Sequence, residues 1–294
     1  TRTLPAKMSS NERIVRMIGA FGTAVLIALQ GYKKKSLSFD GAIAAALVGG
    51  ITLSVTWRFG LTLLLFYFVS SKLTKIGLAE KAKIEAHAKK DATRGSRQVL
   101  GASLTAVIIS LVYVAFISVD DLPIDYLSRY WASFFLCAYM GFFSCSCGDT
   151  WASEIGKLSK AKTATMITTF KPVPKGTNGG VTTLGTLASI AGGIFIGIIF
   201  WLVGWISTPN TDVPQWPLVP YGAALGGLGS LIDSILGATL QETCIDSKSG
   251  KIVSPKTPGA RHVSGLDICS NEGVNLISST AVALIAGFGG SLIF

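Results

Sequence analysis

Long apolar runs separated by shorter polar segments make up the hydrophobic pattern of the chain. An α-helix needs about 20 apolar residues to cross a bilayer. Six runs have about that length: 14–32, 99–119, 131–147, 182–206, 218–241 and 273–294. A further run, 39–71, is too long for one straight span and short for two. It is interrupted at Gly49-Gly50 and at Trp57-Arg58, so it predicts a tight hairpin of two short or tilted helices.

The pattern therefore predicts an all-α, polytopic integral membrane protein with about six to eight transmembrane helices, including the short N-terminal hairpin. We expect residues 1–294 to form a single membrane domain. Composition agrees, since 49% of the residues are hydrophobic and 14% are charged. A soluble domain usually carries about 25% charge. The five cysteines form no Cys-x-x-Cys pair and the two histidines lie far apart, so a zinc site is not expected.

The net charge of +10 is concentrated in loops, and no nucleic-acid-binding motif is present, so we expect no nucleic acid partner. Loops 72–98, 148–181 and 244–273 carry eight, five and four Lys/Arg residues, whereas the alternate loops 119–130 and 207–217 carry one between them. Basic loops face the cytoplasm or an equivalent compartment such as the stroma. The charges at 33–35 and those before residue 17 favour opposite orientations for the first segments. The plasma membrane, endoplasmic reticulum and plastid envelope stay open as locations.

Segment 72–98 is amphiphilic, and two interpretations stay open: a helix along the membrane interface or a solvated connecting helix. Segment 148–181 has the residues for a phosphate site. It holds Asp149 and Glu154, five lysines and a glycine-rich turn at 175–180. Carboxylates can hold a divalent cation, lysines can hold phosphate oxygens, and glycines let backbone N–H groups approach an anion. Helix capping by Asp149 and a surface pair of Glu154 with Lys157 are the structural alternatives.

Asp233 lies inside an apolar run, where an ionisable side chain is costly and faces the protein interior or a wet cavity. A buried structural acid paired with a lysine is the alternative. Stripes of small residues, such as Gly185, Ser189 and Gly193, indicate close helix packing. Asn271 and Asn275 share one face at the start of the last run, where helix capping is again an alternative. All these polar groups fall at the basic ends of their runs, which favours one shared site.

We therefore predict a site with three sets of residues. The catalytic set is Asp149, Asp233, Lys171 and Lys175. The set that binds nucleotide or phosphate is Gly176, Asn178, Gly179, Gly180, Gln241, Asn271 and Asn275. The metal ligands are Asp149, Glu154 and Asp233.

Four motifs also carry a family resemblance: GDTWASE, ITTFKPVPKGTNGGV, GSLIDSILGATLQ and the Asn-x-x-x-Asn start of the last helix. Over roughly residues 36–294 they resemble the transmembrane protein 19 family. That family includes a plant membrane protein linked to glucose responses and the chloroplast phytyl-phosphate kinase of vitamin E synthesis. The chain departs from the family pattern at 269–272, where relatives tend to have Asp-Asn-Asn.

The resemblance implies a kinase that uses CTP and Mg²⁺ to phosphorylate a prenyl phosphate in the membrane. Its expected partners are the prenyl-phosphate lipid, a nucleoside triphosphate and membrane lipid, and a homo-oligomer is left open. Two alternatives stay open: a non-catalytic transporter or sugar-response component, and a cytidylyltransferase that makes CDP-lipids. Inverted internal repeats would favour transport, but the sequence shows no convincing repeat.

Overall fold

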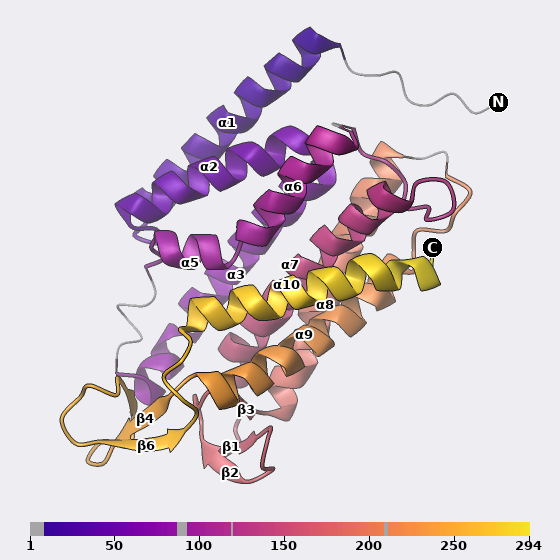
Figure 1. Ribbon diagram of the computed structural model, residues 1–294. Coiled ribbons are helices and arrows are strands. Elements are labelled where there is room, and N and C mark those ends of the chain that lie inside the picture. Colours follow the sequence, from indigo (N-terminus) through magenta and orange to yellow (C-terminus); the bar gives the residue numbers. More distant parts are fainter. Residues whose placement is uncertain (1–8, 87–92, 119, 209–210) are drawn as a thin grey trace.

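The computed structural model describes residues 9–86, 93–118, 120–208 and 211–294 (Figure 1). This part of the chain contains nine α-helices. They are α1 Ser10–Lys33, α2 Phe39–Val55, α3 Trp57–Ile84, α5 Ser96–Gly101, α6 Leu104–Phe116, α7 Tyr130–Gly156, α8 Thr183–Ser207, α9 Leu218–Leu240 and α10 Asn271–Gly289, followed by a 3₁₀ turn at Gly290–Leu292. Among the described residues, α1, α3, α7, α8, α9 and α10 are long and apolar enough to cross a membrane, and α2 and α6 are shorter apolar helices. The predicted membrane fold is confirmed.

The predicted hairpin at 39–71 forms α2 and the first half of α3. The helices are separated at Thr56, whose backbone is extended and whose hydroxyl accepts a hydrogen bond from the Phe59 N–H at 3.1 Å. That hydroxyl caps α3 and fixes where it starts. α3 then continues to Ile84, so the first half of segment 72–98 is an extension of this helix rather than a separate one.

The run 99–119, expected as one span, is instead divided between α5 and α6. Ser103 has non-helical backbone angles, and its hydroxyl donates to the carbonyl of Val99 at 2.6 Å. A serine hydroxyl that bonds to the backbone in this way competes with the helical pattern. The break brings α5 beside the start of α10.

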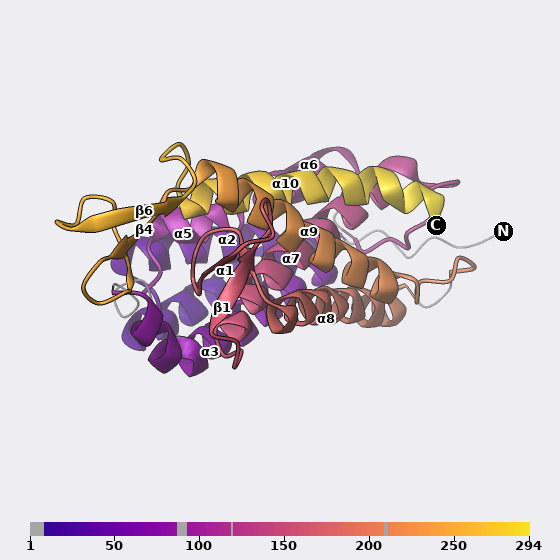
Figure 2. The ribbon, with the colours of Figure 1, turned by 90° about the horizontal axis from the view of Figure 1, so that it is seen from below.

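α7 is the central helix, and it packs against α3, α6, α8, α9 and α10 (Figure 2). Its aromatic residues, including Tyr139, Phe142 and Phe143, are fully buried in the main core. The predicted small-residue stripe on α8 packs against α9, because a Cβ added at Gly197 would lie 2.9 Å from the Cα of Val219. Glycines at such positions let two backbones approach closely.

The three basic loops gather at one end of the helices (Figure 1). The amide of Ala86 donates to the carbonyl of Ile252, and the amide of Asn178 donates to the Thr243 hydroxyl, both at 3.1 Å. α1 ends at this same face, because the amide of Arg94 donates to the Ser36 carbonyl at 3.0 Å. The structure thus places residues 33–35 with the basic loops and the start of α1 at the opposite end.

Two of these loops fold into small antiparallel sheets, which the hydrophobic pattern does not predict. One contains β1 Thr163–Met166, β2 Pro172–Pro174 and β3 Gly180–Val181, in the order β2-β1-β3. The other contains β4 Thr243–Asp246, β5 Ile252–Val253 and β6 Ala260–Ser264, in the order β5-β4-β6.

The sheets have the same register at a constant offset of 80 residues. Ala164 pairs with Val173 in the first sheet, and Cys244 pairs with Val253 in the second. Met166 pairs with Gly180, and Asp246 pairs with Ala260. Left-handed turn residues also correspond: Phe170 with Gly250, and Gly179 with Gly259.

The units α7–sheet–α8 and α9–sheet–α10 are therefore a tandem structural repeat in the same orientation. The sequence shows no convincing repeat, but the structure has one, and it is parallel rather than inverted. The repeat is hidden in the sequence because the two units share backbone pattern more than residues. Phe170 and Gly250 occupy the same left-handed position, and the turn at 175–180 corresponds to one that reads PKTPGA.

Candidate functional site

A cavity of about 660 Å³ opens at the sheet end of the helices. One part is polar and is lined from α7, α9, α10 and the turn between β2 and β3. The other part is an apolar arm between α1, α2 and α3, lined by residues such as Ala24, Val48 and Leu63. The cavity therefore joins the charged end of the protein to its membrane-embedded part.

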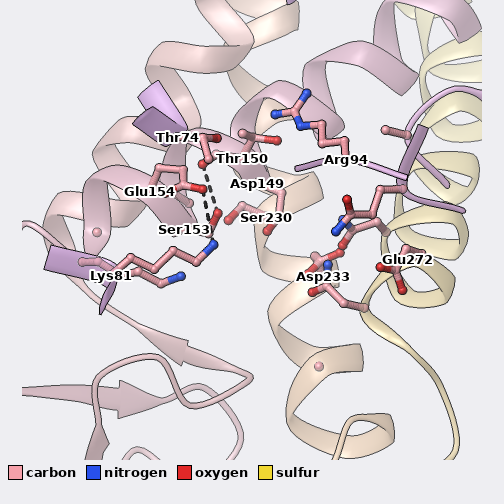
Figure 3. A pocket seen from close by; sticks show the side chains of 18 of the residues that line it. Thr74, Lys81, Arg94, Asp149, Thr150, Ser153, Glu154, Ser230, Asp233 and Glu272 are labelled. Carbon is pink, nitrogen blue, oxygen red and sulfur yellow. Dashed lines mark hydrogen bonds and ion pairs between the residues drawn. The ribbon is translucent and has the colours of Figure 1, made fainter. Parts of the chain in front are cut away.

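Asp149 and Asp233 face each other across the repeat interface, within interaction range of one another (Figure 3). Each lies seven residues before the end of its helix, α7 or α9, so the two aspartates occupy equivalent positions in the repeat. Asp233 accepts a hydrogen bond from the Ser278 hydroxyl at 2.8 Å. With its amide turned to satisfy its neighbours, Asn275 also donates to Asp233 at 3.2 Å. In the part of the chain that is described, no lysine pairs with Asp233. The alternative of a buried structural acid paired with a lysine is therefore not supported.

The glycine-rich turn lines the cavity at Lys175, Gly176, Asn178, Gly179 and Gly180. Its backbone donors are partly occupied, however. The Asn178 N–H donates to Thr243, and the Gly180 N–H donates to the Thr177 carbonyl at 2.9 Å. A phosphate cradle made from those two amides is therefore not supported. Lys175 reaches the cavity wall with its amino group on the carbonyl of Ser159.

Two predicted residues are separate from the aspartate pair. Lys171 is exposed and does not line the cavity. It follows the left-handed turn at Phe170, and its carbonyl accepts from the Met166 amide. Glu154 lines the cavity, but its carboxylate pairs with Lys81 at 3.6 Å rather than joining Asp149 and Asp233 (Figure 3). The structure therefore brings neither Lys171 nor the Glu154 carboxylate to the aspartate pair.

The remaining predicted residues, Gln241, Asn271 and Asn275, all line the cavity. Asn271 is the first residue of α10, and Ser270 caps that helix, so Asn271 is not needed as its cap. Its carbonyl accepts from Asn275 at 3.1 Å. Glu272, the departure from the family pattern, also lines the cavity (Figure 3).

Sequence reasoning missed a set of charges contributed by α3 and the end of α7. Lys81 pairs with Glu154 and with Glu85, and Glu85 pairs with Lys157 at 2.7 Å. The amino group of Lys251 also caps α3 at the Ala82 carbonyl. Arg94 lines the cavity as well. The only signal was the cluster of basic residues in 72–98, which also suits an interfacial helix.

The oxygen ligands beside the aspartate pair suit one type of divalent cation site. No group of three His, Cys, Asp or Glu side chains suited to a metal occurs among the residues described. Mg²⁺ does not require such a group, because it is usually held by one or two carboxylates together with substrate phosphates and water. Two facing carboxylates, with amide and hydroxyl groups beside them, fit a nucleotide-bound Mg²⁺.

Comparison with known proteins gives several matches. The chain matches the family described as "Integral membrane protein DUF92" over residues 22–283. Protein PGR of Arabidopsis thaliana is 37% identical over 282 residues, which cover 95% of this chain and 98% of that protein. An uncharacterized membrane protein of Synechocystis is 31% identical over 218 residues, 74% of this chain and 77% of its own. Protein VTE6, chloroplastic, of A. thaliana is 30% identical over 207 residues, 70% of this chain and 57% of its own. No solved structure matches the chain.

Proposed function

Because this chain belongs to the DUF92 family of integral membrane proteins, we propose that it is a Mg²⁺- and CTP-dependent kinase that converts a prenyl monophosphate into the diphosphate. The observation that carries the proposal is the pair of facing aspartates, Asp149 and Asp233, at the interface of the two repeats. The resemblance to the family that includes the phytyl-phosphate kinase supports the same chemistry.

Two like charges held together at a protein interior repel each other unless a cation or a shared proton lies between them. Asp149 and Asp233 would hold Mg²⁺, and Ser278 and Asn275 would orient Asp233 through their hydrogen bonds. The bound ion would neutralise negative charge on the nucleotide phosphates. Lys175, at the edge of the same cavity, would contribute a positive charge toward the transferred phosphoryl group.

The reaction needs little more than positioning and charge stabilisation. An oxygen of the prenyl monophosphate attacks the terminal phosphorus of CTP, the bond to the departing CDP breaks, and a prenyl diphosphate forms. The attacking oxygen already belongs to a phosphate, so no strong base is required. No histidine or cysteine is among the described residues that line the cavity, which is compatible with the reaction. The polar groups of both repeat units lie at one end of the helices rather than near their middle, where transporters bind substrate, so the transport alternative gains no support from the repeat.

The test is transfer of the terminal phosphate of radiolabelled CTP to phytyl monophosphate by the purified protein. We expect Asp149→Asn and Asp233→Asn each to abolish transfer, because either one removes a carboxylate from the pair. Asp267→Asn makes the same charge change at an exposed position and serves as the control. Full activity of Asp233→Asn would refute the assignment, and release of pyrophosphate would instead indicate CDP-lipid synthesis.

A further inference from the structure

Arg94 lies where the two parts of the cavity meet. Its backbone is held on the loop between α1 and α2: its amide donates to the Ser36 carbonyl, and its carbonyl accepts from the Ser38 amide, both at 3.0 Å. Leu37, in that same loop, lines the cavity on the way to the apolar arm. The position of Arg94 is therefore fixed by two segments that are far apart in the sequence.

Among the described residues, the side chain of Arg94 has no hydrogen-bonded or ion-paired partner, and Glu154, the carboxylate that acts on its charge, already pairs with Lys81. The guanidinium of Arg94 is nevertheless largely buried. Burial lowers the pKa of Arg94, yet a guanidinium stays charged in proteins. Figure 3 shows it extending into the cavity toward the region of Thr150. A buried charge without a partner is costly, so such a group is typical of a binding site.

The rest of the cavity indicates which anion Arg94 would bind. Lys175 and the aspartate pair lie in the polar part, where the nucleotide is placed by the proposed function. The apolar arm is lined mainly by apolar residues of α1, α2 and α3, including Ala28, Ala45 and Gly49. An anion bound at Arg94 would therefore have the nucleotide on one side and, on the other, the apolar arm, which can hold a hydrocarbon chain.

We propose that Arg94 binds the phosphate of the lipid acceptor and that the arm between α1, α2 and α3 holds its hydrocarbon chain. The planar guanidinium can take two phosphate oxygens at once, which orients the remaining oxygen. Gln98 also lines the cavity and, while its side-chain oxygen accepts from the Gly95 amide at 3.3 Å, its amide nitrogen can donate to the same phosphate. This inference rests on the proposed function for the identity of the lipid phosphate, but it concerns binding and does not require turnover.

The test is a calorimetric titration of the protein in lipid nanodiscs with geranylgeranyl monophosphate, and separately with CTP and Mg²⁺. We expect Arg94→Gln to weaken binding of the lipid phosphate by about 10- to 100-fold, the loss typical of one charged hydrogen-bonding group. Binding of CTP should change little. Arg97→Gln, the same change at an exposed position in α5, is the matched control and should bind as the wild type does.

A second pair of variants tests the arm. Ala45→Phe fills it from α2 and should weaken binding of geranylgeranyl monophosphate more than binding of the shorter geranyl monophosphate. Leu47→Phe lies on the exposed side of the same helix and should affect neither. These variants, with Arg94→Lys, keep the proposal testable if Arg94→Gln does not fold. Arg94→Lys keeps the charge but loses the planar fork, so it should bind the lipid phosphate with intermediate affinity.

Several outcomes would overturn the inference: equal affinities of Arg94→Gln and the wild type for the lipid phosphate, loss of CTP binding in place of lipid binding, or no lipid phosphate binding by the wild type. Binding that depends on Arg94 without any phosphoryl transfer would refute the kinase but leave the lipid site standing. Phosphoryl transfer that is unchanged in Arg94→Gln would leave the kinase standing but refute the lipid site.

Discussion

The repeat offers a matched pair of glycines that tests how the site turn is held. Gly179 and Gly259 occupy the same turn position in the two sheets, with φ of 77° and 82°. Their surroundings differ. A Cβ on Gly179 would lie 2.7 Å from both the Ala238 Cα and the Ser234 carbonyl oxygen of α9, whereas a Cβ on Gly259 would meet nothing within 4 Å.

The expected destabilisation follows from this difference. An alanine at either position has a left-handed backbone, which costs about 1–2 kcal/mol. Only Gly179→Ala must also push the turn away from α9, and overpacking of this kind costs about 1–3 kcal/mol more. Gly179→Ala should therefore lower the free energy of unfolding by about 2–5 kcal/mol and Gly259→Ala by about 1–2 kcal/mol.

Titration of both variants with SDS in mixed micelles measures the two free energies. Effects on the unfolded chain are the same for both changes and cancel in the comparison. Phosphoryl transfer should fall in Gly179→Ala, because the turn carries Lys175 into the cavity, and should be retained in Gly259→Ala. Equal destabilisation of the two variants would refute the docking of this turn on α9.

Other predictions concern single charges. Lys175→Ala should reduce phosphoryl transfer strongly, whereas Lys171→Ala should change it little, because Lys171 does not line the cavity; a larger loss in Lys171→Ala, measured by the same assay, would contradict the structure. At the end of the helices opposite the two sheets, Asp121→Ala should destabilise the protein by about 3–5 kcal/mol in SDS titration. The change leaves the fully buried Arg58 without its carboxylate partner. Replacing both residues, as Arg58→Met with Asp121→Ala, should recover part of that loss, and a double variant less stable than Asp121→Ala alone would count against a buried ion pair.

The sequence was informative where the hydrophobic pattern is strong. The spans at 182–206 and 218–241 match α8 and α9 within one residue at each end. A long apolar run in a bilayer forms an α-helix, because the helix satisfies its backbone hydrogen bonds internally. The break at Ser103 was not foreseen, since it depends on one side-chain hydrogen bond within an otherwise apolar run.

Parts of the site followed from the same reasoning. Asp233 stood out as a carboxylate within an apolar run, and the structure places it beside Asp149. Arg94 did not stand out, because the sequence gives it no more weight than the other basic residues of 72–98. Its role depends on the contacts of its backbone with Ser36 and Ser38, and only the folded chain brings these together. The short sheets were missed because their strands are two to five residues long and lie between turns.

The central claim is that Asp149 and Asp233 hold one divalent cation between the two repeats. The most direct measurement is electron paramagnetic resonance of Mn²⁺, used in place of Mg²⁺, bound to the purified protein with CTP. We predict that the wild type binds the ion and that Asp149→Asn and Asp233→Asn each lose it, while Asp267→Asn keeps it. Wild-type Mn²⁺ binding in both single variants would contradict the claim.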